Sequence, residues 1–91
     1  MRISQYLLKS VTFYTRPQCG LCGTAKTNLM AAGKTVPFDY KEVNIDEPEN
    51  KEFYDLYAFD VPVMKFEDGS SEKIVMHRIT TEQAIETLNS L

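Results

Sequence analysis

The sequence contains two cysteines, Cys19 and Cys22, which are separated by only two residues. On a helix this spacing places the two side chains one turn apart on the same face, so their sulfur atoms come within disulfide distance. Such a pair can cycle between a dithiol and a disulfide. A disulfide that closes so small a loop adds little stability to a fold, which favours a redox role over a structural one.

The residues around the cysteines predict where the pair lies. Val11–Thr15 is a β-branched and aromatic run that predicts a buried strand, and Pro17 then predicts a turn. From Cys22, small and apolar residues recur every three or four positions up to Gly33, which predicts a helix that ends there. We therefore expect Cys19 at the helix N-terminus, where unpaired backbone N–H groups and the helix dipole lower the pKa of a thiol. Cys19 would be the nucleophile, and Cys22 its resolving partner.

The rest of the chain predicts a mixed sheet. Val36–Val43 predicts a second strand, parallel to the first because a helix connects the two. A helix is expected to begin at Pro48, with Phe53, Leu56 and Tyr57 facing inward. The remaining predicted elements are a strand with Met64 and Phe66, a turn at Asp68-Gly69, an antiparallel strand Lys73–His77, and a last helix with a capping box at Thr80 and Gln83. The predicted fold is therefore α/β, in the order βαβαββα.

Length and composition limit the class of protein. At 91 residues, with 43% apolar and 25% charged residues, the chain predicts one globular domain, and no apolar run approaches a membrane span. Two cysteines are too few for a disulfide-rich secreted protein, so we expect a reducing compartment such as the cytoplasm. Residues 1–9 are basic and free of acids. They are either a lead-in to the first strand or the remnant of a transit peptide, and the second alternative would place the protein in the mitochondrion.

Charge is distributed unevenly in this chain of net charge −3. Residues 1–38 carry five bases and no acids, whereas residues 39–91 carry five bases and thirteen acids. The cysteines lie in the basic part, where positive charge would stabilise a thiolate and attract a small anionic thiol such as glutathione. The alternative is that the acids only solvate the later helices. Scattered bases in an acidic chain argue against nucleic acid binding.

Several of these features together resemble the thioredoxin fold: a strand leading into Cys-x-x-Cys at a helix start, a distant Val-Pro, a hairpin and a terminal helix. The run Phe13-Tyr14-Thr15-Arg16-x-x-Cys19-x-x-Cys22 is similar to the active-site run of glutaredoxins. The phrases Thr-Arg-Pro-x-Cys-x-Leu-Cys and Val61-Pro62-Val63 resemble a small, divergent glutaredoxin-like family more closely still. The resemblance implies one glutaredoxin-like domain over residues 10–91, with a four-stranded mixed sheet flanked by helices.

The same resemblance implies roles for residues near the cysteines. Pro62 would be a cis-proline facing the pair, which leaves the Val61 backbone to pair with a peptide or glutathione like an added strand. Arg16 matches the base that contacts the glycine carboxylate of glutathione, and the alternative is a solvated loop charge. Glutaredoxins carry Gly-Gly and acids after the last strand, whereas this sequence has Met76–Thr80 there. In that segment Arg78 would meet a carboxylate instead.

The histidine and the tyrosines are assigned no catalytic part. His77 is expected at the surface or at a strand end rather than as a base for Cys19. The tyrosines are expected to be packing aromatics rather than ligands, with Tyr14 beneath the cysteine site. They are Tyr6, Tyr14, Tyr40, Tyr54 and Tyr57.

The predicted function is a thiol-disulfide oxidoreductase in which Cys19 and Cys22 reduce protein or glutathione mixed disulfides. We expect glutathione as co-substrate, no tightly bound cofactor or metal, and a monomer. One alternative is a module that binds a metal or iron–sulfur cluster through the same cysteines. Two thiolates fall short of the usual four ligands, so a second subunit or glutathione would have to supply the others. The other alternative is a non-catalytic thioredoxin-fold adaptor or redox sensor.

Overall fold

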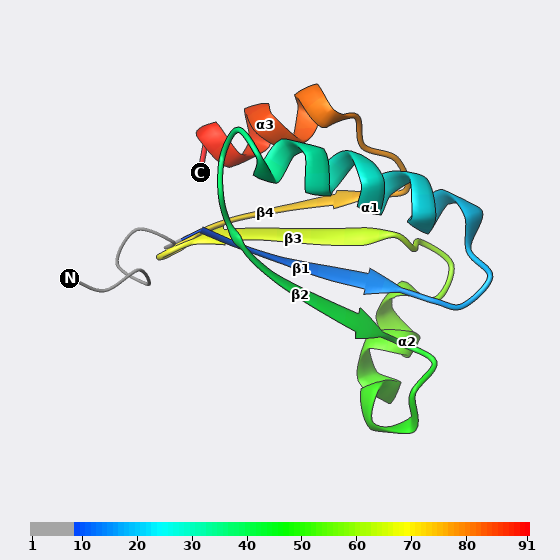
Figure 1. The fold of residues 1–91 in the computed structure, drawn as a ribbon. Coiled ribbons are helices and arrows are strands. Elements are labelled where there is room, and N and C mark those ends of the chain that lie inside the picture. Colours follow the sequence, from blue (N-terminus) through cyan, green and yellow to red (C-terminus); the bar gives the residue numbers. More distant parts are fainter. Residues whose placement is uncertain (1–8) are drawn as a thin grey trace.

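The computed structural model describes residues 9–91 and shows a four-stranded mixed sheet with helices on both faces (Figure 1). The predicted βαβαββα order is confirmed. The expected lead-in falls mostly on residues 1–8, outside the described residues, and Lys9 already belongs to the first strand. The elements are β1 (Lys9–Thr15), α1 (Gly20–Gly33), β2 (Asp39–Asn44), a 3-10 turn η2 (Pro48–Asn50), α2 (Lys51–Tyr57), β3 (Val63–Asp68), β4 (Ser71–Met76) and α3 (Thr81–Asn89).

The strand order in the sheet is β2-β1-β3-β4. β1 runs parallel to β2 because α1 connects the two, and β3 and β4 form an antiparallel hairpin around Gly69 and Ser70. β1 also pairs antiparallel with β3, so that Tyr14 near the end of β1 lies opposite Val63 at the start of β3. The loop after β1 and the segment before β3 therefore leave the sheet at the same end, and these are the segments that carry Cys19 and Pro62.

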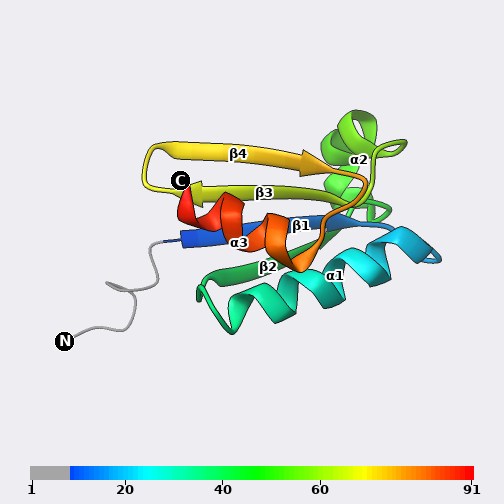
Figure 2. The ribbon, with the colours of Figure 1, turned by 90° about the horizontal axis from the view of Figure 1, so that it is seen from above.

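Two apolar layers enclose the sheet. α1 and α3 cover one face, and α2 lies against the other face near the ends of β1 and β2 (Figures 1 and 2). Because side chains alternate along a strand, Phe13 points into the α1 and α3 layer while Tyr14 points into the α2 layer. There the Tyr14 ring lies 5.0 Å from the ring of Phe53 and 4.9 Å from that of Tyr57, centroid to centroid.

Two predictions about aromatic and apolar packing are wrong. Tyr14 does not lie beneath the cysteines, because it is on the opposite face of the sheet, and Phe13 takes that place. Leu56 does not face inward, since 62% of it is exposed. The seven-residue α2 presents only Phe53 and Tyr57, one turn apart, to the sheet. Tyr54 is 39% exposed and belongs to neither buried cluster.

The element boundaries differ from the predicted ones by up to three residues. α1 begins at Gly20 rather than Cys22, because Cys19 acts as its N-cap. β2 begins at Asp39 rather than Val36, and β4 ends at Met76, before His77. The capping box at the start of α3 is present, with Thr80 and Gln83 each accepting the other's backbone N–H. No helix between residues 9 and 91 is long and apolar enough to cross a bilayer.

Candidate active site

Cys19 and Cys22 form a disulfide at the N-terminus of α1, with their Cα atoms 5.2 Å apart. The backbone N–H of Cys22 donates to Sγ of Cys19 over 3.2 Å, so the Cys19 sulfur occupies the position of a helix cap. Cys19 is half-buried, whereas Cys22 is only 4% exposed and belongs to the core under α1. The two sulfurs thus differ in access, and Cys19 is the one that a second molecule can reach.

The turn before α1 orients Cys19. Gln18 has a φ of 60°, a left-handed backbone conformation that residues other than glycine rarely adopt. This reverses the chain after Pro17, so that Cys19 is extended and α1 starts immediately after it. No acidic residue lies in the first turn of α1, so the unpaired N–H groups there face the Cys19 sulfur without a competing carboxylate.

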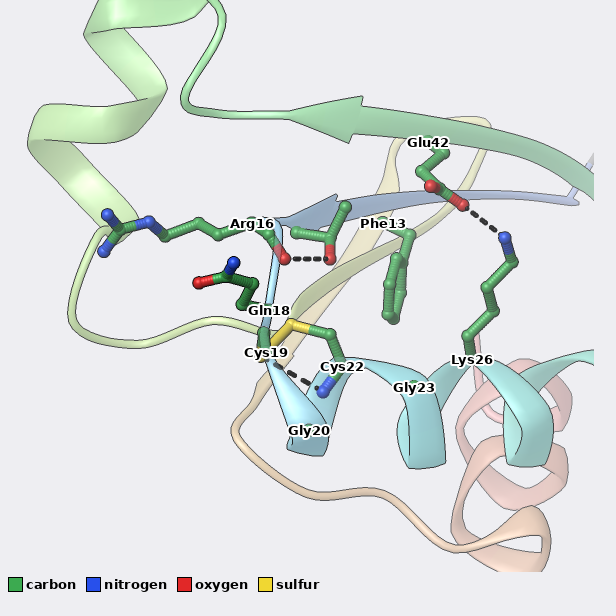
Figure 3. Close-up of a pocket in the computed structure, with 10 residues that line it drawn as sticks. Phe13, Arg16, Gln18, Cys19, Gly20, Cys22, Gly23, Lys26 and Glu42 are labelled. Atoms are coloured by element: carbon green, nitrogen blue, oxygen red, sulfur yellow. Dashed lines mark hydrogen bonds and ion pairs between the residues drawn. A yellow bond between two sulfur atoms is a disulfide. The ribbon is translucent and has the colours of Figure 1, made fainter.

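An open hollow of about 490 Å³ lies beside the cysteines, and we call it the cysteine hollow. One wall is the ring of Phe13, which points from β1 toward α1 next to the disulfide (Figure 3). The other lining residues come from the β1–α1 loop, from α1 and from β2: Thr15, Arg16, Gln18, Cys19, Gly20, Cys22, Gly23, Lys26 and Glu42. Cys19 is therefore open to an outside molecule from this side.

Lys26 and Glu42 form an ion pair at the rim of the cysteine hollow, with Nζ and Oε1 2.8 Å apart. The Tyr40 hydroxyl donates to the same Glu42 oxygen over 2.7 Å. Lys26 and, to a lesser degree, Tyr40 hold the pKa of the Glu42 carboxyl below its ordinary value. This pair was not predicted from the sequence. Its signal was that Lys26 follows Cys22 by one helical turn, and therefore lies on the same side of α1.

Arg16 lines the cysteine hollow, but its guanidinium points away from Cys19 toward α2 (Figure 3). Nε lies 2.9 Å from Oδ1 of Asp46, and Nη1 donates to the Ala58 carbonyl over 3.2 Å. The guanidinium carbon is also 5.0 Å from the centre of the Tyr54 ring. Arg16 is thus neither directed at the cysteines nor a solvated loop charge, because three groups of the fold contact it.

The Val61–Pro62 peptide bond is cis, as the resemblance implied. Pro62 is buried, and its carbonyl accepts the backbone N–H of His77 over 2.8 Å. Within residues 9–91, the backbone N–H and C=O of Val61 make no hydrogen bond to another residue.

Arg78 and His77 follow β4, on the other side of α1 from Glu42. The His77 side chain is exposed, and its Nε2 lies 2.9 Å from Oδ1 of Asp60, so the expected surface position at a strand end is confirmed. Arg78 lines a smaller hollow of about 190 Å³ that Leu21, between the cysteines, also lines. Among the described residues, no carboxylate pairs with the Arg78 guanidinium. The structure brings Arg78 to the α1 side of the site.

The described residues contain no group of three or more His, Cys, Asp or Glu side chains that could hold a metal ion. A metal or cluster would need ligands from outside these residues, as the two cysteines alone do not complete the usual four.

Comparison with known proteins assigns the family. The family model described as Glutaredoxin-like domain (DUF836) matches residues 10–89. The chain belongs to this glutaredoxin-like family. A glutaredoxin-like protein of Dictyostelium discoideum, named as a homolog of YDR286C, is 32% identical over an alignment of 87 residues, and the match covers 90% of this chain and 77% of that protein.

Solved structures confirm the thioredoxin-like fold of this glutaredoxin-like domain. Oxidized thioredoxin O2 from Arabidopsis thaliana superimposes with a TM-score of 0.72 at 21% identity, covering 97% of this chain and 77% of that one. Protein Ne2328 from Nitrosomonas europaea gives 0.70 at 22% identity, with 88% and 91% covered. A glutaredoxin-like domain of this fold with the pair Cys19-x-x-Cys22 has a function of the general thiol-redox type.

Proposed function

We propose that this chain is a thiol-disulfide oxidoreductase that reduces protein or glutathione mixed disulfides, with glutathione as its co-substrate. The observation that carries the proposal is the unequal exposure of the two cysteines. Cys19 opens into the cysteine hollow at a helix N-terminus, and Cys22 is buried behind it. An accessible nucleophile with a shielded resolving thiol suits attack on an outside disulfide followed by internal closure.

The reaction starts from the dithiol. The Cys19 thiolate, stabilised by the N–H groups at the start of α1, attacks one sulfur of the substrate disulfide, and the other sulfur leaves as a thiolate that takes up a proton. Cys22 then loses its proton and attacks the Cys19 sulfur, which releases the second substrate thiol and forms the Cys19–Cys22 disulfide. Two molecules of glutathione restore the dithiol with two electrons and become glutathione disulfide.

Three further residues, Val61, Arg78 and Arg16, are proposed to bind a substrate beside Cys19. The unpaired backbone groups of Val61, held by cis-Pro62, can add an extended peptide or glutathione as a short strand. Arg78 presents a guanidinium on the Leu21 side and is proposed to bind a substrate carboxylate. Arg16 is proposed to bind the glycine carboxylate of glutathione from the other side. The proposed setting is a reducing compartment, the cytoplasm or the mitochondrion, in which the protein acts as a monomer.

The test is reduction of a glutathionylated peptide, coupled to glutathione reductase. Cys19→Ser is expected to lose activity to the uncatalysed background, because the remaining thiol, Cys22, is only 4% exposed. Cys22→Ser retains the nucleophile and should accumulate a glutathione adduct on Cys19, which mass spectrometry detects. The alkylation rate of Cys19 against pH in the Cys22→Ser protein measures the expected low thiol pKa. Full activity of a folded Cys19→Ser protein would exclude the proposed function.

A further inference from the structure

Asp46, in the loop after β2, pairs with Arg16, which we expect to bind the substrate. Asp46 itself is not among the predicted site residues. We propose that Asp46 is a specificity-determining residue: its carboxylate occupies Arg16 in place of a ligand carboxylate and so weakens the binding of the glycine end of glutathione. The inference rests on the proposed function, since it concerns the substrate of the same site. It makes glutathione a weaker ligand than a protein disulfide that places no free carboxylate near Arg16.

Arg16 already donates hydrogen bonds to two groups of the fold. Nε donates to Asp46 and Nη1 donates to the Ala58 carbonyl, so two of the three guanidinium nitrogens are already in use. A carboxylate that binds a guanidinium through two parallel hydrogen bonds needs two neighbouring nitrogens. Every such pair includes Nε or Nη1. A ligand carboxylate must therefore share or displace one of the existing contacts, and Asp46 is the one with the same charge as the ligand.

Backbone hydrogen bonds of its loop fix the position of Asp46. The backbone N–H of Ile45 donates to the Thr15 carbonyl over 3.0 Å, and Ile45 is buried in the α2 layer. The backbone N–H of Asp46 donates to Oδ1 of Asn44 over 2.9 Å, which closes a turn around the loop. These bonds tie Asp46 to the residue that precedes Arg16. Its carboxylate is held beside the guanidinium by the backbone of both loops.

The test compares Asp46→Asn with wild type. The probe is S-methylglutathione, which cannot form a disulfide, and its dissociation constant is measured by NMR titration. Asp46→Asn should bind it about two- to fivefold more tightly, the factor expected for a part-exposed ion pair. The gain should be absent when the glycine carboxylate of the probe is converted to an amide, and absent in an Arg16→Ala background.

Asp55→Asn is the matched control. It removes one carboxylate from another exposed ion pair, with Lys51 on α2, and changes the net charge equally. Any of three results would overturn the inference. They are an equal gain in Asp55→Asn, no gain in Asp46→Asn, and no binding of the probe by both Asp46→Asn and wild type. Asp46→Ser removes the same charge should the Asn variant misfold.

The two proposals fail separately in these experiments. Tighter probe binding by Asp46→Asn without turnover of the glutathionylated peptide by wild type would contradict only the proposed function. Normal turnover with an unchanged dissociation constant would contradict only the role of Asp46.

Discussion

Glu42 joins two elements at the rim of the cysteine hollow. It comes from β2, and it accepts hydrogen bonds from Lys26 of α1 and from Tyr40 of its own strand. Both partners favour the ionised carboxylate, and its pKa is lowered for that reason. A carboxyl whose pKa is lower in the folded state stabilises the fold above its ordinary pKa, and this contribution is lost as the pH falls through the folded value.

Glu42→Gln is therefore expected to lower the free energy of unfolding at neutral pH by at most about 1 kcal/mol, because both side chains of the pair are partly exposed. At about pH 3, below the ordinary range of a glutamate pKa, the difference from wild type should shrink toward zero. Urea unfolding of both proteins at the two pH values measures it. A difference that persists in acid would mean that Glu42 acts through packing rather than charge.

Arg16 and Phe13 show what could be predicted at single residues. The cysteine pair followed from spacing alone, because an i, i+3 relation at a helix start is local. The partner of Arg16 is 30 residues away in sequence, so the pairing with Asp46 depends on the register of β1 and β2. Likewise, whether Phe13 or Tyr14 lies beside the cysteines depends on which face of β1 each helix covers. Alternation along the strand shows only that the two residues differ in face.

The helices differ in how much of their apolar surface the sheet covers. α3 packs Leu88 fully into the layer it shares with α1, whereas the short α2 leaves Leu56 62% exposed. The same residue type thus lies in two opposite environments. The order and type of the elements were predictable from periodicity and turn residues. The exposure of Leu56 was not, because an apolar residue next to a periodic stripe is indistinguishable from a member of it.

Leu88→Ala and Leu56→Ala form a matched pair of substitutions. Leu88→Ala should lower the free energy of unfolding by about 2–5 kcal/mol, since it removes a buried side chain and leaves a cavity. Leu56→Ala should change it by less than about 0.5 kcal/mol. Urea unfolding at one pH compares both with wild type. Equal losses in the two variants would show that α2 packs Leu56 against the sheet after all.

Across the whole molecule, the charge asymmetry of the sequence is largely neutralised near the site. The two bases that line the cysteine hollow, Arg16 and Lys26, pair with Asp46 and Glu42 from the acidic part of the chain. Segments of opposite charge thus meet in the fold because β1 and β2 are adjacent and parallel. The positive surroundings predicted for the cysteines are consequently weaker than the count of bases suggested, and helix N-terminal N–H groups remain as the main stabilisation of a Cys19 thiolate.

Activity toward an anionic substrate should therefore depend only weakly on salt. Raising NaCl from about 0.05 M to about 0.5 M is expected to change kcat/KM for an acidic glutathionylated peptide by less than about twofold. The double variant Asp46→Asn/Glu42→Gln leaves Arg16 and Lys26 without their carboxylates and should give a steeper loss. A tenfold or larger loss in the wild type would contradict the neutralisation of the hollow.

The central position of β1 and β3 also bears on how the molecule opens. Both are hydrogen bonded on two sides, whereas β2 and β4 are the edges of the sheet. Amide hydrogens of the inner strands should consequently be the slowest to exchange with solvent. The Cys19 loop continues directly from β1, and Pro62 leads directly into β3 at the same end. Local opening of either edge strand would leave both segments at the same end of the paired inner strands, so that fluctuations at the periphery need not interrupt the cysteine cycle.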